Sequence, residues 1–240
     1  MPDFTPLHPK IVLGIVAHPD DLEFGVAGTI AKYVAQGAQA YYYVLTNGNK
    51  GSDDATMTPD MLRDTRRAEQ RAAAEILGVS EVFFSDYDDG ALECNYDVKR
   101  DIVRAIRRIK PDVVITFDPT LVYSTAMGVI NHTDHRAAGQ ATLDACYPLA
   151  RDRLSFPELA EEGLAAHKVA SVLMINFDDT NYCEDITDTY DIKMRALAAH
   201  ASQLPDIEST KAMLKKIAEK CGEHTHTRYG EGFIRLDLPA

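Results

Sequence analysis

Features that would place a protein in a membrane or an oxidising compartment are missing from this sequence of 240 residues. No apolar stretch approaches the roughly 20 residues that span a bilayer, and the first residues lack the basic and apolar regions of a signal peptide. The four cysteines, Cys94, Cys146, Cys183 and Cys221, are far apart and form no C-x-x-C pair. This spacing disfavours a cysteine-ligated metal and favours reduced, packed thiols. We therefore predict a cytoplasmic protein without a membrane partner.

Positive charge is also scarce. The chain has 25 lysines and arginines against 37 aspartates and glutamates, and its formal net charge is −12 at pH 7. No basic stripe is present, which argues against a nucleic-acid partner, although a single arginine can still bind a small anion. Hydrophobic residues make up 45% of the sequence, enough for one buried core. Because no repeat or linker interrupts the chain, we expect one domain over residues 1–240.

Two common functional signatures are absent as well. No G-x-G-x-x-G follows the first apolar run, and a His-Pro-Asp-Asp turn stands where a dinucleotide pyrophosphate would bind. No G-x-S-x-G is present, which disfavours a serine hydrolase. A nucleotide- or sugar-binding domain that holds only a structural metal stays open as an alternative to an enzyme.

Apolar runs alternate with helical patterns along the chain. Strands are expected over residues 10–17, 40–46, 81–85, 112–117, 171–177 and 232–238. Helices are expected over residues 26–36, 59–77, 96–109, 134–145, 192–201 and 210–221. The alternation predicts an α/β fold, a three-layer, Rossmann-like and mostly parallel sheet with helices on both faces. Functional sites of such folds lie at the C-terminal ends of the strands.

Polar residues follow four of these strands. His18 comes after the first strand, residues 46–48 after the second, Asp89 after the third and Asp118 after the fourth. Because the strands are expected to be parallel, their C-terminal ends meet at one edge of the sheet. We therefore expect the functional residues to gather at this edge.

The residues around His18 have the composition of half a metal site. Zinc binds neutral imidazole and carboxylate, and catalytic sites keep one position open for water. A helical turn that begins at Pro19 would aim His18 and Asp21 at one point, and His135 would be the third ligand. Asp20 lies between the first two and is a natural general base. Either motif alone could be a capped turn or a chance pair of histidines, but together they predict a metal site.

Two residues of the second motif have candidate roles in catalysis. His132 lies one turn before His135 and would point to the same side of the helix. It could hydrogen-bond the substrate carbonyl oxygen and the oxyanion formed from it, or protonate the departing amine. Asp134 could orient His132 or a ligand histidine.

The segment Ala17-His18-Pro19-Asp20-Asp21-Leu22-Glu23 and the segment His132-Thr133-Asp134-His135 resemble the two motifs of the LmbE/PIG-L family of zinc-dependent N-acetylglucosaminyl deacetylases. Threonine replaces the usual proline of the second motif. Five further segments resemble the family in the same order: residues 45–51, 66–69, 89–90, 193–203 and 229–233. The resemblance covers most of the chain, so we expect a single LmbE/PIG-L-like domain.

The resemblance and the spacing together give three sets of residues. They are the zinc ligands His18, Asp21 and His135, the catalytic residues Asp20, His132 and Asp134, and the substrate-binding residues Arg66 and Asp89. The last two would bind sugar hydroxyls or a neighbouring phosphate or inositol. Zn²⁺ is the implied cofactor, although a His₂Asp set also accepts other divalent metals. The family often forms trimers or hexamers, so a homo-oligomer is implied.

The implied activity is removal of the acetyl group from an N-acetylglucosamine-type sugar or its glycoside, by attack of metal-activated water on the acetamide. An amidase that cleaves a larger sugar–thiol conjugate or another amide is the alternative. Pocket size would decide between them, and residues 118–131 and 147–170 are expected to set it. The second of these segments has the weakest pattern and is interpreted as an insertion or lid.

Three more polar residues allow structural as well as functional interpretations. Arg66 could pair with Glu69 or Asp64 on a solvated helix face instead of binding substrate. His200 and Gln203 are spaced at i and i+3 and are expected as a buried polar pair that ties their helix to the sheet.

Overall fold

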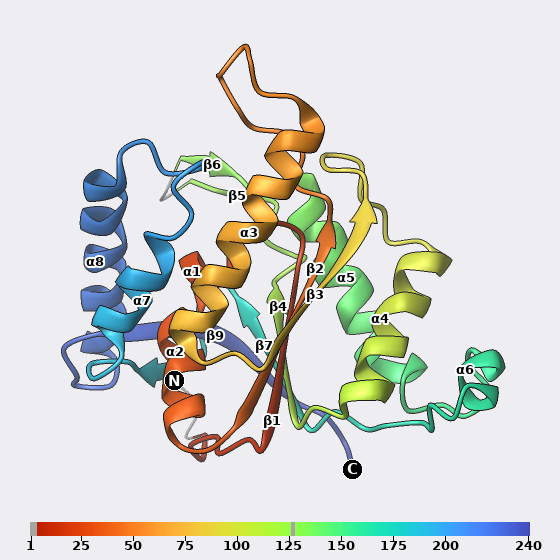
Figure 1. The fold of residues 1–240 in the computed structure, drawn as a ribbon. Helices are drawn as coiled ribbons and strands as arrows, with labels where there is room; N and C mark the ends of the chain where they lie inside the picture. The colour runs from red at the N-terminus through yellow and green to blue at the C-terminus, as the bar shows by residue number, and fades with distance from the viewer. Residues whose placement is uncertain (1–3, 126–127) are drawn as a thin grey trace.

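A seven-stranded sheet forms the centre of the fold (Figure 1). The computed structural model describes residues 4–125 and 128–240. Five parallel strands in the order β3-β2-β1-β4-β7 are followed by β9 and β8, each antiparallel to its neighbour. The bounds are β1 Ile11–Val16, β2 Gln39–Thr46, β3 Glu81–Tyr87, β4 Val113–Phe117, β7 Ser171–Ile175, β8 Tyr182–Asp185 and β9 Gly230–Asp237. A separate hairpin pairs β5 (Tyr123–Ser124) with β6 (Val129–Ile130).

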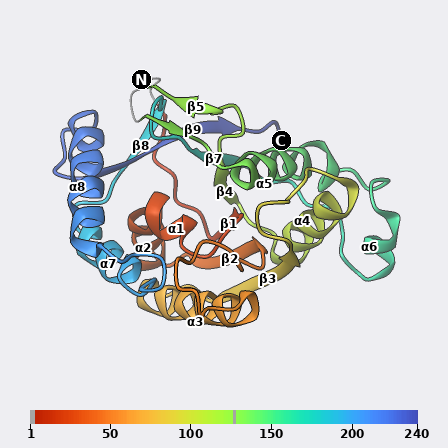
Figure 2. The same cartoon turned by 90° about the horizontal axis from the view of Figure 1, so that it is seen from above.

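Helices cover both faces of the sheet (Figure 2). Helices α1 (Asp21–Gly25), α2 (Ala27–Ala35), α3 (Pro59–Leu77) and α7 (Tyr190–Leu197) lie on one face, and α4 (Tyr96–Ile109) and α5 (Thr133–Asp144) on the other. The remaining helices are η1 (Ala145–Leu149), α6 (Pro157–Glu161) and α8 (Ile207–Glu223). No helix of the described residues is long and apolar enough to cross a membrane. The three-layer, mostly parallel α/β fold is confirmed.

Side-chain alternation along β1 explains why the sheet is covered twice. Val12 and Val16 belong to the hydrophobic cluster under α1–α3, whereas Leu13 and Ile15 belong to the cluster under α4 and α5. All four side chains are fully buried. A strand that is buried on both faces needs a continuous run of apolar residues, and the sequence of β1 is such a run.

The long helix α3 begins and ends as its sequence predicts. Thr58 caps it, because its hydroxyl accepts a hydrogen bond from the N–H of Met61 at 3.2 Å. Gly78 ends it with φ +75°, a left-handed conformation that glycine adopts without a steric penalty.

The C-terminal strand is joined to the first helices by a buried carboxylate. Glu231 of β9 accepts hydrogen bonds from the N–H groups of Gly28 (3.1 Å) and Thr29 (2.7 Å) at the start of α2. Lys193 of α7 donates to the same carboxylate at 2.5 Å. The positive end of the α2 dipole and the ammonium therefore neutralise Glu231. This contact gives a physical reason for the matching segments around residues 193 and 231.

The structure differs from the prediction at strand β8 and at the end of helix α7. β8 is not predicted by an apolar pattern, because it includes Glu184, whose buried carboxylate accepts from Lys32 and Tyr33 on α2. Helix α7 ends at Leu197, so His200 and Gln203 lie in the following turn and not on one helix face. His200 is buried as expected, but it contacts Glu23 of α1 and not the sheet, and Gln203 is only half-buried, so the predicted buried pair does not form.

Residues 147–170 are not a lid. They connect α5 to the start of β7, at the edge of the sheet opposite the C-terminal ends of the parallel strands (Figure 1). Arg107 of α4 anchors them, with its side chain 1% exposed. Its guanidinium donates hydrogen bonds to the carbonyl oxygens of Leu149, Ala150, Asp152, Ser155 and Phe156. The hydrogen bonds of one buried guanidinium therefore hold this segment in place, although its sequence has no regular hydrophobic pattern.

We expect Arg107→Met to destabilise the fold by about 2–4 kcal/mol, because methionine fills the space but leaves buried carbonyl oxygens without donors. Denaturant unfolding measures the change. Arg104→Met is the matched control on the same helix, since the partly exposed guanidinium of Arg104 pairs with the exposed Glu162, and it should cost less than about 1 kcal/mol. Equal effects of the two substitutions would contradict the anchoring role of Arg107.

Candidate metal and active site

The loop after β1 places three candidate residues at the edge of the sheet. Asp20 has φ +93°, a left-handed conformation that is strained for a residue with a Cβ. Helix α1 begins at Asp21, two residues after the predicted start at Pro19. The N–H of His18 donates to the Asp21 carboxylate at 2.8 Å. This hydrogen bond folds the carboxylate back beside the imidazole, which is the convergence that the sequence spacing predicted.

The start of α5 places the two histidines of the second motif. His132 is the N-cap residue, and its Nδ1 accepts a hydrogen bond from the N–H of Asp134 at 3.2 Å. The ring of His135 stacks on Phe117 at the end of β4, with centroids 4.0 Å apart and planes 8° apart. Nδ1 of His135 contacts Oδ1 of Asn131 at 3.1 Å. These contacts leave Nε2 of His135 facing His18.

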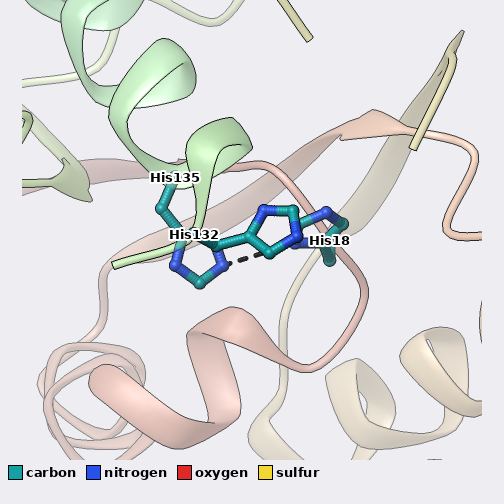
Figure 3. Close-up of side chains that lie close together, drawn as sticks. All are labelled: His18, His132 and His135. Atoms are coloured by element: carbon teal, nitrogen blue, oxygen red, sulfur yellow. Dashed lines mark hydrogen bonds between the residues drawn. The ribbon is translucent and has the colours of Figure 1, made fainter. Parts of the chain in front are cut away.

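His18, Asp21 and His135 lie close together, and Figure 3 shows the imidazoles of His18 and His135 turned toward each other beside His132. Nδ1 of His18 is 3.3 Å from Nε2 of His135, which is 3.0 Å from Oδ1 of Asp21. Oδ2 of Asp21 is 3.7 Å from Nδ1 of His18. Two atoms bound to one tetrahedral zinc at about 2.1 Å lie roughly 3.4 Å apart. The donor atoms and their spacing therefore fit a metal ion.

Two buried carboxylates hold the other side of the His18 ring. Nε2 of His18 is 3.1 Å from Asp89 and 3.2 Å from Asp134. Asp134 also accepts hydrogen bonds from the N–H groups of Gly90 (2.6 Å) and Leu92 (3.2 Å). A proton on Nε2 would leave the Nδ1 lone pair free for a metal. Asp134 thus contacts His18, the predicted ligand histidine, which is one of its two predicted partners.

The structure also brings together two other groups of possible metal ligands. Ring nitrogens of His18, His132 and His135 lie within 4.8 Å of one another, and so do ligand atoms of His18, Asp89 and Asp134. His18 belongs to both groups, which makes it the centre of the cluster. In the second group, Asp134 and Asp89 already accept hydrogen bonds from backbone amides, so we favour a supporting role for these carboxylates.

The cluster stabilises positive charge. Although burial opposes a charged imidazole, the hydrogen bonds to Asp134 and Asp89 raise the pKa of His18 to about 10. Burial likewise opposes ionisation of Asp21, but His135 and His18 lower the pKa of Asp21 to about 2. The field that retains a proton on His18 would equally attract a divalent cation in its place.

Asp20 and His132 flank the cluster and face the adjoining cavity. Burial raises the pKa of Asp20 to about 6, although Arg66 acts in the opposite direction. Burial lowers the pKa of His132, and the neighbouring His18 and His135 add to this effect. A carboxylate and an imidazole with shifted pKa values beside a possible metal site are typical of acid–base chemistry.

Arg66 of α3 is buried beneath the loop after β1 and the loop after β2, and its guanidinium faces Asp20. Its guanidinium donates to the carbonyl oxygens of Gly48, Lys50 and Pro19 and is 3.5 Å from the Asp20 carboxylate. The surface pairing with Glu69 or Asp64 is not what the structure shows, because these acids contact Ser202 and Arg63 instead. Gly48 permits the close packing, since its φ is +62° and a Cβ there would lie 2.9 Å from Pro19.

A cavity of about 420 Å³ opens above the cluster. His18, Asp20, Asp21, Arg66, His132 and His135 form its polar end, and most of its other walls are apolar. Residues 121, 124 and 129–131 line it, as expected for the loop 118–131, whereas residues 147–170 do not contribute. Met213, Leu214 and Ile217 of α8 form a further wall that the sequence did not predict. Asp89 lies behind His18 and outside the lining, so its contact with substrate stays a prediction.

A buried polar chain behind Asp20 was missed at the sequence level. The N–H of Asp20 donates to Oε1 of Gln70 at 2.9 Å, and Nε2 of Gln70 donates to both oxygens of Glu23 at 3.1 Å. Nε2 of His200 is 3.1 Å from Glu23. Gln70, Glu23 and His200 are all fully buried. Glu23 within the first motif was the available signal, but no spacing rule links it to Gln70 on α3.

Comparison with known proteins agrees with the motifs. Residues 13–146 match the family model PIG-L, described as GlcNAc-PI de-N-acetylase. The chain is 34% identical to a diacetylchitobiose deacetylase of Thermococcus kodakarensis over 93% of this chain and 82% of that protein. It is 30% identical to a mycothiol S-conjugate amidase of Streptomyces coelicolor over 64% and 57% of the two chains.

A solved structure extends the agreement to the fold. The N,N'-diacetylchitobiose deacetylase from Pyrococcus horikoshii superposes with a TM-score of 0.88 at 31% identity, over 95% of this chain and 84% of that one. The resemblance inferred from the two histidine motifs is therefore confirmed. The protein belongs to the PIG-L family, whose model is described as GlcNAc-PI de-N-acetylase.

Proposed function

We propose that this protein is a metal-dependent N-deacetylase that hydrolyses the acetamide of an N-acetylglucosamine-type sugar or its glycoside. The main support is the convergence of His18, Asp21 and His135 with Asp20 and His132 at the polar end of one cavity. The diacetylchitobiose deacetylase relatives support the choice of an N-acetylated amino sugar as substrate.

We propose His18, Asp21 and His135 as the ligands of a divalent metal, with zinc the first candidate. When bound there, such an ion would lower the pKa of a water ligand and polarise a carbonyl oxygen. The donor set of two imidazoles and one carboxylate suits zinc and also other borderline divalent ions. Asp134 and Asp89 would keep the His18 ring oriented for this task.

Asp20 and His132 would move the protons. Asp20 lines the cavity beside the proposed ligands, so its carboxylate would accept a proton from the attacking water. His132, on the other side of His18, would donate a hydrogen bond to the oxyanion or pass a proton to the departing amine. Arg66 would hold Asp20 in place and is also within reach of a substrate in the cavity.

An amidase that cleaves a larger amide is the second candidate, and the mycothiol S-conjugate amidase among the relatives favours it. Both candidates use the same cluster and differ in the group that occupies the cavity. A binding domain with a structural metal is the third possibility, and it requires no turnover. Location in the cytoplasm, a homo-oligomeric state and a single domain over residues 1–240 stay predictions.

Removal of the metal should abolish turnover. We expect the protein to release acetate from N-acetylglucosamine, diacetylchitobiose or related glycosides, to lose activity with a chelator, and to regain it with added zinc. His135→Ala should reduce the metal content and should lower the rate of acetate release at least 100-fold. His8→Ala, at an exposed histidine, should change neither quantity. Turnover of only a sugar–thiol conjugate would favour the amidase, and an absence of metal-dependent turnover on either class would reject both enzymes.

Asp20→Asn should retain the metal and lower kcat about 100-fold or more, because an amide cannot accept the proton. Acetate release and elemental analysis measure the two properties. Asp88→Asn is the matched control, since Asp88 is exposed and its carboxylate pairs with the exposed Lys50. Full activity of Asp20→Asn would contradict its assignment as the base.

Gln70→Leu should lower kcat roughly tenfold or more while KM and metal content stay near those of the parent protein. Leucine removes the acceptor that holds the strained Asp20 backbone, and small displacements of a catalytic group are costly. The control is Gln140→Leu, an exposed glutamine of α5. An unchanged kcat in folded Gln70→Leu would rule out a positioning role for this residue.

A further inference from the structure

Cys183 of β8 and Cys221 of α8 lie in direct contact, 38 positions apart in the chain. Their sulfur atoms are 2.7 Å apart, and both cysteines are free thiols in the structure. A disulfide bond is about 2.05 Å long, so closing one requires the sulfurs to approach by less than about 1 Å. Cys94 and Cys146 have no such neighbour among the described residues: the Cys94 thiol lies near Asp144, and Cys146 is buried in the apolar cluster under α4 and α5.

The surrounding backbone leaves space for this pair. A Cβ at Gly230 of β9 would lie 2.6 Å from the sulfur of Cys183, and a Cβ at Gly232 would lie 3.2 Å from the sulfur of Cys221. Gly232 is also the residue paired with Cys183 across the β8–β9 ladder. The two glycines therefore allow α8 to approach the sheet closely enough for the sulfurs to meet.

The pair differs from the other cysteines in access and reactivity. Cys221 lines a second cavity of about 210 Å³, which shares Phe24, Phe177, Leu214 and Ile217 with the cavity above the metal cluster. The contact between the two thiols lowers the pKa of Cys183 and raises the pKa of Cys221, whereas burial raises the pKa of Cys146 and of Cys94. A thiol of lowered pKa beside a second thiol at a cavity wall is the arrangement that favours disulfide exchange.

We propose that Cys183 and Cys221 are a redox-active pair that forms a reversible disulfide with a small-molecule disulfide such as oxidised glutathione. The step is an exchange in which the Cys183–Cys221 sulfur–sulfur bond forms and the sulfur–sulfur bond of the oxidant breaks. The two thiol protons and two electrons pass to the oxidant, which leaves as two thiol molecules. A reduced dithiol reverses the exchange.

The disulfide would attach α8 covalently to the sheet. It closes a loop that includes α7 and most of α8, so it restricts the unfolded chain. Met213, Leu214 and Ile217, which form one wall of the first cavity, lie on the same helix roughly one to two turns before Cys221. Oxidation should therefore stabilise the helix that forms this wall, without touching the proposed metal ligands.

Mass spectrometry of the full-length protein after treatment with oxidised glutathione tests this proposal. We expect the mass to fall by the two hydrogens of the thiols, a peptide that joins Cys183 to Cys221, and complete reversal by dithiothreitol. The midpoint of thermal unfolding should rise by roughly 5 °C in the oxidised protein. The double variant Cys94→Ser with Cys146→Ser should behave in the same way.

Cys183→Ser and Cys221→Ser should each lose both the cross-link and the thermal shift. Because serine preserves the size of the side chain, both variants should fold, and the reduced protein gives their reference stability. Persistence of a mixed disulfide with glutathione, a cross-link that involves Cys94 or Cys146, or failure of any bond to form would each overturn the proposal. None of these measurements depends on the hydrolase activity.

Discussion

The buried imidazole of His18 is the contact on which the rest of the site depends. Its Nε2 meets Asp89 and Asp134, while its Nδ1 faces His135 and Asp21. Asp134 simultaneously accepts hydrogen bonds from the loop after β3. One ring therefore links the end of β1, the loop after β3 and the start of α5, three segments that the parallel sheet delivers to the same edge. Together with the direct contact between His135 and Asp21, this ring brings the two histidine motifs to a common point.

The charge of this cluster constrains the neighbouring structure. Several carboxylates lie close together with little access to water, which is costly unless cations or amide donors compensate them. Arg66 compensates Asp20, backbone amides compensate Asp134, and the imidazoles compensate Asp21. The same need for positive charge makes the cluster receptive to a divalent ion. The concentration of carboxylates at the site thus explains both its need for positive charge and its fit to a metal ion. The strained backbone of Asp20 is tolerated because hydrogen bonds to Gln70 and Arg66 hold it from two sides.

The sequence predicted those parts of the structure that follow from local patterns. Alternating runs gave the parallel strands, and the two histidine motifs predicted that His18, Asp21 and His135 would converge, because strand ends and helix starts have fixed directions. The hydrophobic pattern failed to predict structure that depends on a buried polar side chain. Examples are β8, which contains the buried Glu184, and residues 147–170, which are held by the buried Arg107 of α4. The link from Asp20 through Gln70 to Glu23 and His200 joins three distant segments. Nothing in the spacing of these residues could indicate that they touch.

The walls of the cavity divide into a chemical part and a recognition part. The proposed ligands and proton carriers belong to the loop after β1, the start of α1 and the start of α5, at the C-terminal ends of the parallel strands. Phe24, Phe117, Ile175 and Phe177 line the cavity from α1 and from the ends of β4 and β7, but the remaining apolar walls, from residues 121, 129 and 130 and from α8, lie outside the parallel part of the sheet. Changes in these walls would alter the group that fits without moving a ligand atom. This separation gives a physical reason why the relatives of this chain include both a diacetylchitobiose deacetylase and a mycothiol S-conjugate amidase. Substrate choice is therefore expected to follow α8 and the loop 118–131, and the chemistry to follow the two histidine motifs.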